Sequence, residues 1–124
     1  MIHGIGTDIL EIKKLNPCFL NKSDPFFTNT FTAAEAEEGA KRNNLLSYYA
    51  TRFAGKEAVF KALRLSPENI KLNEIEILND PDGAPCVTLY GEIKNRAERF
   101  GVKTVHISLS WETEYAIAFA VAEK

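Results

Sequence analysis

A carboxylate and an ammonium lie one helical turn apart near the middle of the chain. Glu57 and Lys61 belong to an alanine-rich segment that is typical of a helix. Their i,i+4 spacing places them on the same helix face, where they suit a metal ligand beside a phosphate anchor. An ion pair on a solvated helix surface is the structural alternative, and the spacing alone fits both.

A second lone carboxylate follows two glycines close to the amino terminus. Gly4, Gly6 and Asp8 share one face of a predicted strand. Glycine inside a strand often marks the close approach of a ligand or another backbone, whereas a bulge with an exposed Asp8 is the alternative. Mg²⁺ prefers oxygen ligands and is commonly held by one or two carboxylates together with substrate phosphates. Asp8 and Glu57 are therefore predicted Mg²⁺ ligands if the long helix packs across this strand.

A later strand carries groups that bind phosphate oxygens. Within residues 103–110 an imidazole and two hydroxyls alternate with apolar side chains, at His106, Ser108 and Ser110. Such groups hydrogen-bond phosphate oxygens, and His106 can also move a proton. A sheet with one wet face is the structural alternative. The sequence has no Walker loop or nucleophile elbow, and with two histidines in all a His-based zinc site is not expected.

Hydrophobic periodicity and turn residues predict the elements that must position these groups. In chain order we expect a strand at 2–12, an irregular segment at 13–30, a helix at about 33–41 opened by a capping box of Thr32 and Glu35, a long helix at about 46–65, a strand at 74–78, a hairpin turn at 79–83, a return strand at 85–90, a helix at 93–100 ended by Gly101, and strands at 103–110 and 114–122. Alanines recur every fourth residue on the long helix and every second residue on the last strand, so we expect these faces to pack together. Large residues on the other face of that strand imply burial on both sides. The order predicts an α+β domain with a mainly antiparallel sheet packed against one long helix and shorter helices.

Length and composition set the class of protein. The chain has 124 residues and a net charge of −2, which indicates one domain, 1–124, with no general attraction to nucleic acid or anionic membrane. No apolar run approaches the ~20 residues that span a bilayer. The first residues lack the regions of a signal peptide, so we expect a cytoplasmic protein. Cys18 and Cys86 are far apart and are expected to be reduced thiols.

Taken together, the motifs resemble those of the holo-acyl-carrier-protein synthases, the small stand-alone 4′-phosphopantetheinyl transferases. The matching residues, in the order of that family, are Gly4-Ile5-Gly6-Thr7-Asp8-Ile9, Phe31-Thr32 with Glu35, Arg52-Phe53-Ala54-Gly55-Lys56-Glu57-Ala58 with Lys61, and His106-Ile107-Ser108-Leu109-Ser110 with Tyr115-Ala116. The resemblance covers nearly the whole chain. It implies transfer of the 4′-phosphopantetheine arm of coenzyme A to a serine of apo acyl carrier protein, leaving adenosine 3′,5′-bisphosphate.

The resemblance also implies roles for individual residues. Asp8 and Glu57 are the expected Mg²⁺ ligands, and Glu57, Lys61 and His106 the expected catalytic residues. Lys61, His106 and Ser108 are expected to contact coenzyme A. The base is expected near Glu57 or His106, with Glu35 acting through water as a lesser candidate. The family's assembly implies a homotrimer with coenzyme A in clefts between subunits, and acyl carrier protein as the partner.

The chain departs from the family pattern at three places. Arg64-Leu65-Ser66-Pro67 replaces a frequent glycine-rich turn, and Trp111 replaces a usual histidine. Residues 13–30 carry only three basic groups, all lysines, where the carrier-facing segment is usually rich in arginine. Two other functions stay open: a metal-dependent phosphohydrolase, which would need a third acidic ligand, and a non-catalytic trimer that binds coenzyme A.

Overall fold

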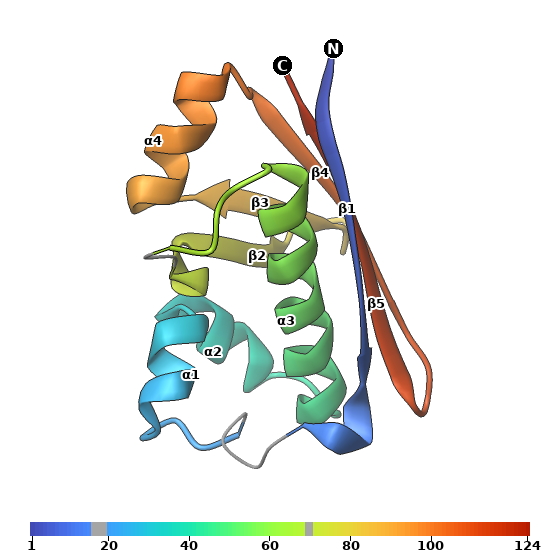
Figure 1. Cartoon of the computed structure of the whole chain (residues 1–124). Coiled ribbons are helices and arrows are strands. Elements are labelled where there is room, and N and C mark those ends of the chain that lie inside the picture. The colour runs from blue at the N-terminus through green and yellow to red at the C-terminus, as the bar shows by residue number, and fades with distance from the viewer. Residues whose placement is uncertain (16–19, 69–70) are drawn as a thin grey trace.

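In the computed structural model, one long helix lies between two layers (Figure 1). The structure describes residues 1–15, 20–68 and 71–124. One layer is a three-stranded antiparallel sheet in the order β1-β5-β4, and the other contains the two-stranded sheet β2-β3 together with shorter helices. The elements are β1 (Ile2–Glu11), η1 (Ile12–Lys14), α1 (Pro25–Thr30), α2 (Ala33–Gly39), α3 (Leu45–Ala62), η3 (Leu72–Glu74), β2 (Ile75–Asn79), β3 (Pro85–Leu89), α4 (Gly91–Phe100), β4 (Thr104–Trp111) and β5 (Tyr115–Glu123).

The α+β class is confirmed, and the antiparallel strands form two sheets. The hairpin and the C-cap were predicted correctly: β2 pairs antiparallel with β3, and Gly101 ends α4 with a left-handed φ of 80°. The capping box of Thr32 and Glu35 opens α2. No helix in the part of the chain that the structure describes is long and apolar enough to cross a membrane. Cys86 is a free, exposed thiol, whereas Cys18 lies outside the described residues.

The prediction of an irregular segment over 13–30 is wrong at both ends of that segment. The short helix η1 starts it, and α1 occupies its last six residues. Asp24 caps α1 by accepting a hydrogen bond from the Phe26 amide at 2.8 Å, and Pro25 stands at the first helical position, where its missing N–H costs nothing. This start signal was present in the sequence. Tertiary packing decides the outcome, because Phe27 is buried in an aromatic cluster with residues of α3.

β1 approaches α3 so closely that two of its positions have no room for a side chain. A Cβ atom added at Gly4 would lie 2.3 Å from the Ala62 carbonyl oxygen, and one added at Gly6 would lie 2.0 Å from that of Ala58. The glycines of β1 and the alanines of α3 therefore form one contact. The glycine pattern thus reports the approach of another backbone, which was one of its two predicted meanings.

The three-stranded sheet has one packed face and one open face. The alanine row of β5 faces α3 and is buried, as predicted. The opposite face is only partly covered in a single chain, so the prediction of burial on both sides is wrong for the chain alone: Ile5 is 67% exposed and Phe119 is 53% exposed. The chain ends lie side by side, since the Lys124 amide donates to the Met1 carbonyl at 2.8 Å (Figure 1).

We predict that Gly6→Ala destabilises the protein by about 3 kcal/mol, because the added methyl group meets the backbone of α3. The matched control is Gly101→Ala, whose Cβ has no neighbour within 4 Å but whose φ is 80°. That change should cost only about 1 kcal/mol of left-handed strain. Urea unfolding measures both free energies. Equal losses would contradict the close approach of β1 to α3.

Candidate active site

β1 and α3 bring the predicted ammonium to the predicted carboxylate. Lys61 Nζ lies 3.3 Å from Asp8 Oδ1 and also donates to the Thr7 carbonyl oxygen at 3.0 Å. The close packing of the glycines sets this distance, because Asp8 follows Gly6 by two residues on the same strand face. The alternative in which Lys61 pairs only with Glu57 on a solvated helix does not describe the structure.

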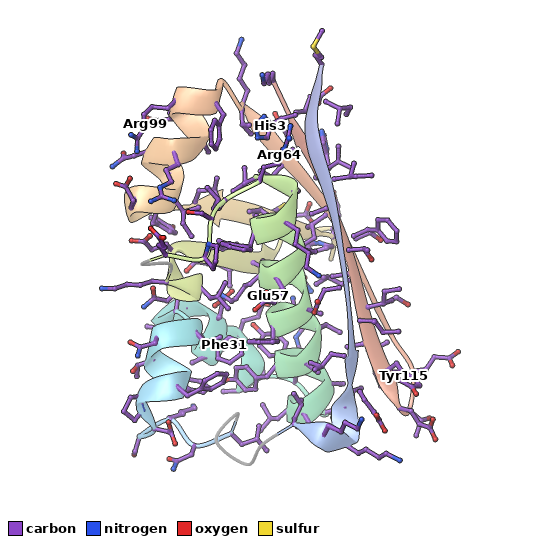
Figure 2. All side chains as sticks on the ribbon, in the orientation of Figure 1. His3, Phe31, Glu57, Arg64, Arg99 and Tyr115 are labelled. Carbon is purple, nitrogen blue, oxygen red and sulfur yellow. The ribbon has the colours of Figure 1, made fainter. Side chains whose placement is uncertain are left out.

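Glu57 completes the cluster from the same helix face. It is half-buried on α3, where Figure 2 shows it in the middle of the helix. Burial raises the pKa of the Glu57 carboxyl above its ordinary value, the negative charge of Asp8 raises it further, and Lys61 opposes both. Two carboxylates that repel each other in this way are stabilised by a cation placed between them.

The donor set fits a hard cation that keeps open positions for water and phosphate. Across residues 1–15, 20–68 and 71–124, no group of three His, Cys, Asp or Glu side chains is close enough to hold a metal ion. Asp8 and Glu57 thus offer two carboxylates, the number with which Mg²⁺ is usually held beside substrate phosphates. The third acidic ligand that a metal-dependent phosphohydrolase would need is not among these residues.

A cavity of about 250 Å³ opens beside Glu57. Its other walls are apolar and come from Phe60, Pro67 and Leu72. Glu57 therefore lies at the edge of a space that accepts an organic group.

His106 and Ser108 lie on the other face of the sheet. Asp8 pairs with Ala118, whose side chain is buried against α3, whereas His106 pairs with Val121 on the open face. Partners directly opposite each other in a sheet point to the same side. One chain therefore does not bring His106 or Ser108 to the Asp8–Glu57 pair, and a second copy of the chain would have to do so.

His106 has a carboxylate partner on this open face. Its Nε2 lies 2.9 Å from Glu123 Oε1, and both side chains are accessible to solvent. The hydrogen bond from His106 lowers the pKa of Glu123, and the charge of the protonated ring acts in the same direction. The imidazole is therefore oriented from one side and is open on the other.

Glu35 lies in the core and has no exposed surface. Its Oε1 lies 2.7 Å from Lys56 Nζ and accepts from the Thr32 amide, while its Oε2 accepts from the Ile77 amide at 2.8 Å. Every oxygen of this carboxylate is occupied, so the structure does not support Glu35 as a base acting through a water molecule.

Lys56 is a residue whose role the sequence did not reveal. Its side chain is fully buried and donates to the carbonyl oxygens of Leu72, at 3.1 Å, and Ile75. Burial lowers the pKa of Lys56, and the negative charge of Glu35 opposes this effect. The sequence contained one signal for this role: Lys56 and Glu57 are consecutive, and consecutive helix positions face different sides, so a Glu57 at the surface implies that Lys56 points inward.

A second cavity, of about 460 Å³, contains two residues without a predicted role. Trp111, which is 49% exposed, lines it together with the nearly buried Arg52. Arg52 donates to Asn79 Oδ1 at 2.8 Å and to Glu38, but its buried Nε atom has no hydrogen-bond partner among the described residues. Trp111 therefore forms a cavity wall at the end of β4.

Known proteins are similar to this chain in sequence and in fold. The 4′-phosphopantetheinyl transferase superfamily matches residues 4–120. The holo-[acyl-carrier-protein] synthase of Dehalococcoides mccartyi strain ATCC BAA-2266 is 45% identical over 118 residues, which are 95% of this chain and 96% of that protein.

Solved structures agree with the sequence relatives. The holo-[acyl-carrier-protein] synthase of Neisseria meningitidis superimposes with a TM-score of 0.88 at 32% identity, over 100% of both chains. The Helicobacter pylori enzyme, solved in complex with coenzyme A, gives a TM-score of 0.80 at 28% identity over 96% of this chain and 99% of that chain. The sequence similarity and the fold lead to one assignment: the chain belongs to the holo-[acyl-carrier-protein] synthase family of 4′-phosphopantetheinyl transferases.

Proposed function

We propose that this chain transfers the 4′-phosphopantetheine group of coenzyme A to a serine of apo acyl carrier protein, with Mg²⁺ as cofactor and adenosine 3′,5′-bisphosphate as second product. The observation that carries the proposal is the cluster of Asp8, Glu57 and Lys61, with Glu57 lining an apolar cavity, in a chain of this family. The coenzyme A complex of the Helicobacter pylori relative supports the choice of donor.

The reaction breaks one phosphorus–oxygen bond of the pyrophosphate and forms another. The serine hydroxyl attacks the phosphorus that carries the pantetheine arm, and the bisphosphate departs with the bridging oxygen. Asp8 and Glu57 would hold Mg²⁺, which would supply positive charge to neutralise the pyrophosphate. The Lys61 ammonium, now 3.3 Å from Asp8, donates to a phosphate oxygen and stabilises the charge that builds on the leaving group. His106 or Glu57 accepts the serine proton.

The position of His106 favours a site shared between subunits. In a cyclic trimer each contact joins two different surfaces. In the arrangement that we propose, the open sheet face of one subunit meets the surface of the next subunit that carries Asp8, Glu57 and Lys61. The open face carries exposed apolar side chains that a monomer would leave in water, among them Ile5, Ile9, Ile117 and Phe119. Ser108 lies beside them, since it pairs with Phe119. We therefore propose a homotrimer in which Asp8, Glu57 and Lys61 of one subunit face His106 and Ser108 of its neighbour.

The transfer itself is tested by weighing apo acyl carrier protein after incubation with the chain, coenzyme A and Mg²⁺. We predict the added mass of phosphopantetheine, its loss in EDTA, and a fall in rate of about a thousandfold for Asp8→Asn and for Glu57→Gln, because a bound metal contributes several kcal/mol of charge stabilisation. Glu112→Gln, which removes an exposed carboxylate from the β4–β5 turn, is the matched control and should keep full activity.

Three results separate the alternatives. An unmodified carrier, tested with several carrier proteins, would refute the transferase. Release of the bisphosphate without modification of the carrier would indicate a phosphohydrolase. Undiminished transfer in EDTA would refute the metal role of Asp8 and Glu57 while leaving the transfer intact.

The shared site is tested by mixing two inactive variants, Asp8→Asn and His106→Ala. After refolding together, about a quarter of the interfaces in a random trimer combine an intact Asp8 with an intact His106, so about a quarter of the wild-type activity should return. Each variant refolded alone is the control. Full activity of His106→Ala alone, no recovery in the mixture, or a sedimentation mass near the 13.9 kDa of one chain would contradict the proposal.

A further inference from the structure

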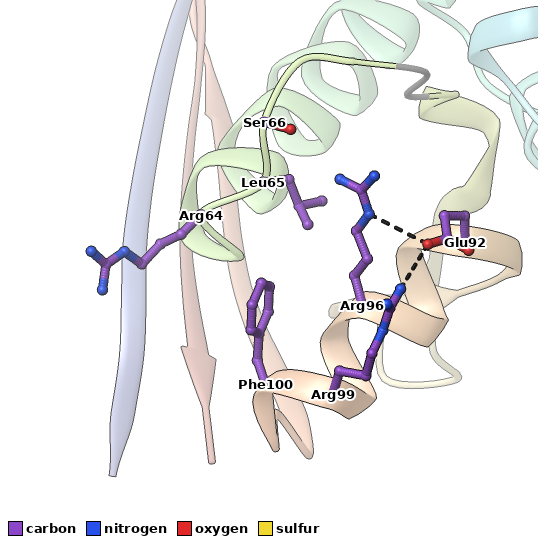
Figure 3. A pocket seen from close by; sticks show the side chains of 7 residues that line it. All are labelled: Arg64, Leu65, Ser66, Glu92, Arg96, Arg99 and Phe100. Atoms are coloured by element: carbon purple, nitrogen blue, oxygen red, sulfur yellow. Dashed lines mark hydrogen bonds and ion pairs between the residues drawn. The ribbon is translucent and has the colours of Figure 1, made fainter.

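A cavity of about 510 Å³ lies between the end of α3 and one face of α4, and none of the residues of the candidate active site lines it. Arg64, Leu65 and Ser66 form one wall, and α4 forms the other (Figure 3). The first wall belongs to the segment that replaces the frequent glycine-rich turn of the family.

The α4 wall presents a row of charged groups. Glu92, Arg96 and Arg99 have i,i+4,i+7 spacing, which places them on one helix face, while Ile93 and Ala97 on the other face are buried. Glu92 Oε1 is 2.7 Å from Arg99 Nη2 and 3.4 Å from Arg96 Nε. Hydrogen bonding from Asn95 lowers the pKa of Glu92, desolvation opposes this, and the positive charge of Arg99 lowers it further, so this carboxylate is ionised at neutral pH.

The cations of the cavity outnumber its anions. Three arginines and one glutamate line it, so three positive charges and one negative charge leave a net charge of +2, in a chain whose total charge is −2. Arg96 uses only its Nε atom for Glu92, and Figure 3 shows its two terminal nitrogens turned away from that carboxylate. A guanidinium with both terminal nitrogens free presents a planar fork that suits a phosphate.

Arg64 supplies a further cation from a strained position. Its φ is 60°, and it is the one non-glycine residue with a positive φ among those that the structure describes. A left-handed arginine costs about 1 kcal/mol relative to glycine, and such strain often accompanies a functional residue. Its guanidinium has no hydrogen bond or ion pair within the described ranges and points toward β1 in Figure 3. The long side chain is thus free to turn toward an anion in the cavity.

The remaining wall is apolar and fixed in place. Phe100 stacks on His3 with ring centroids 4.9 Å apart, and His3 Nε2 is hydrogen-bonded to the Leu63 carbonyl oxygen at 3.0 Å. Figure 2 shows His3 beside Arg64 at the end of α3. Phe100 and Leu65 thus give the cavity an apolar side next to its arginines, which suits a ligand with both an organic part and a phosphate.

We propose that this cavity binds a phosphate monoester, with Arg96 and Arg99 as its principal ligands and Arg64 as a third. This monoester has one of two sources. It is the 3′-phosphate of coenzyme A, and this assignment rests on the proposed function, or it belongs to a separate phosphorylated molecule, and that assignment is independent of the proposed function. Both sources present the same dianionic group to the arginines.

Binding of inorganic phosphate, followed by NMR shifts of the α4 amides, tests the site without any transfer reaction. Arg96→Gln/Arg99→Gln should weaken phosphate binding at least about tenfold, since each charged hydrogen bond contributes more than the free energy of a tenfold change. Lys94→Gln removes a charge from the same helix outside this cavity and is the matched control. Equal binding by wild type and double variant, no binding by wild type, or an equal loss in Lys94→Gln would overturn the proposal.

Arg64→Gly separates binding from stability. Glycine relieves the positive φ, so the melting temperature should stay the same or rise while phosphate binding weakens. A lower melting temperature together with unchanged phosphate binding would overturn the role of Arg64.

The source of the monoester is read from KM in the transfer assay. For the double variant, a higher KM for coenzyme A but not for dephospho-coenzyme A identifies the 3′-phosphate. An unchanged KM for both, with phosphate binding lost, identifies a separate phosphorylated molecule. An equal rise for both substrates would overturn the assignment to a phosphate monoester.

Discussion

The contact between the backbone of β1 and the backbone of α3 determines the geometry of the candidate site. Side chains normally separate a strand from the helix that covers it, but here Gly4 and Gly6 lie directly against helix carbonyl oxygens. The contact between these backbones therefore sets the distance between the strand and the helix. At that distance the ammonium of Lys61 reaches both the backbone of β1 and the carboxylate of Asp8. Any wider spacing would separate the two predicted metal ligands.

A buried ion pair fixes the rotation of the same helix. Lys56 points into the core, where Glu35 and two carbonyl oxygens hold its ammonium. Its neighbour Glu57 therefore faces away from the core and lines the cavity of the candidate site. Such a pair is costly to bury and contributes little net stability, but removing one partner leaves an uncompensated charge. The pair also ties α2 and β2 to α3, because Glu35 accepts a hydrogen bond from the Ile77 amide. The interior thus orients a residue that acts at the surface.

Most of the architecture followed from local patterns in the sequence. The alanine and glycine spacings predicted which faces meet, and the capping box and Gly101 predicted helix boundaries that the structure confirms. Helix α1 was missed because six residues carry little periodicity, although Asp24 and Pro25 mark its start. α3 ends at Ala62 rather than near residue 65, because Arg64 adopts a left-handed conformation that arginine seldom prefers.

Only one part of the candidate site could be predicted from the sequence, and the reason is physical. Asp8, Glu57 and Lys61 lie together because they belong to one strand face and one helix face that pack on each other. The alternation of β4 showed that His106 points away from its apolar neighbours, but the relation of that face to Asp8 depends on strand order. β5 lies between β1 and β4, and its register places Ala118 with Asp8 and Val121 with His106. The sequence alone does not contain this strand order and register, and it also does not show that Glu35 is enclosed in the core.

The adjacency of the two chain ends has a consequence for folding during synthesis. β1 is made before the other described strands, yet its partner in the sheet is β5, the last of them. Until β5 leaves the ribosome, β1 has no strand to pair with among those described, and the sheet face that covers α3 is incomplete. Closing so long a loop is entropically slow, so the helices and the β2-β3 hairpin are expected to form before the three-stranded sheet. The Asp8–Lys61 contact would then be among the last to form on a nascent chain, and a truncated product would lack it.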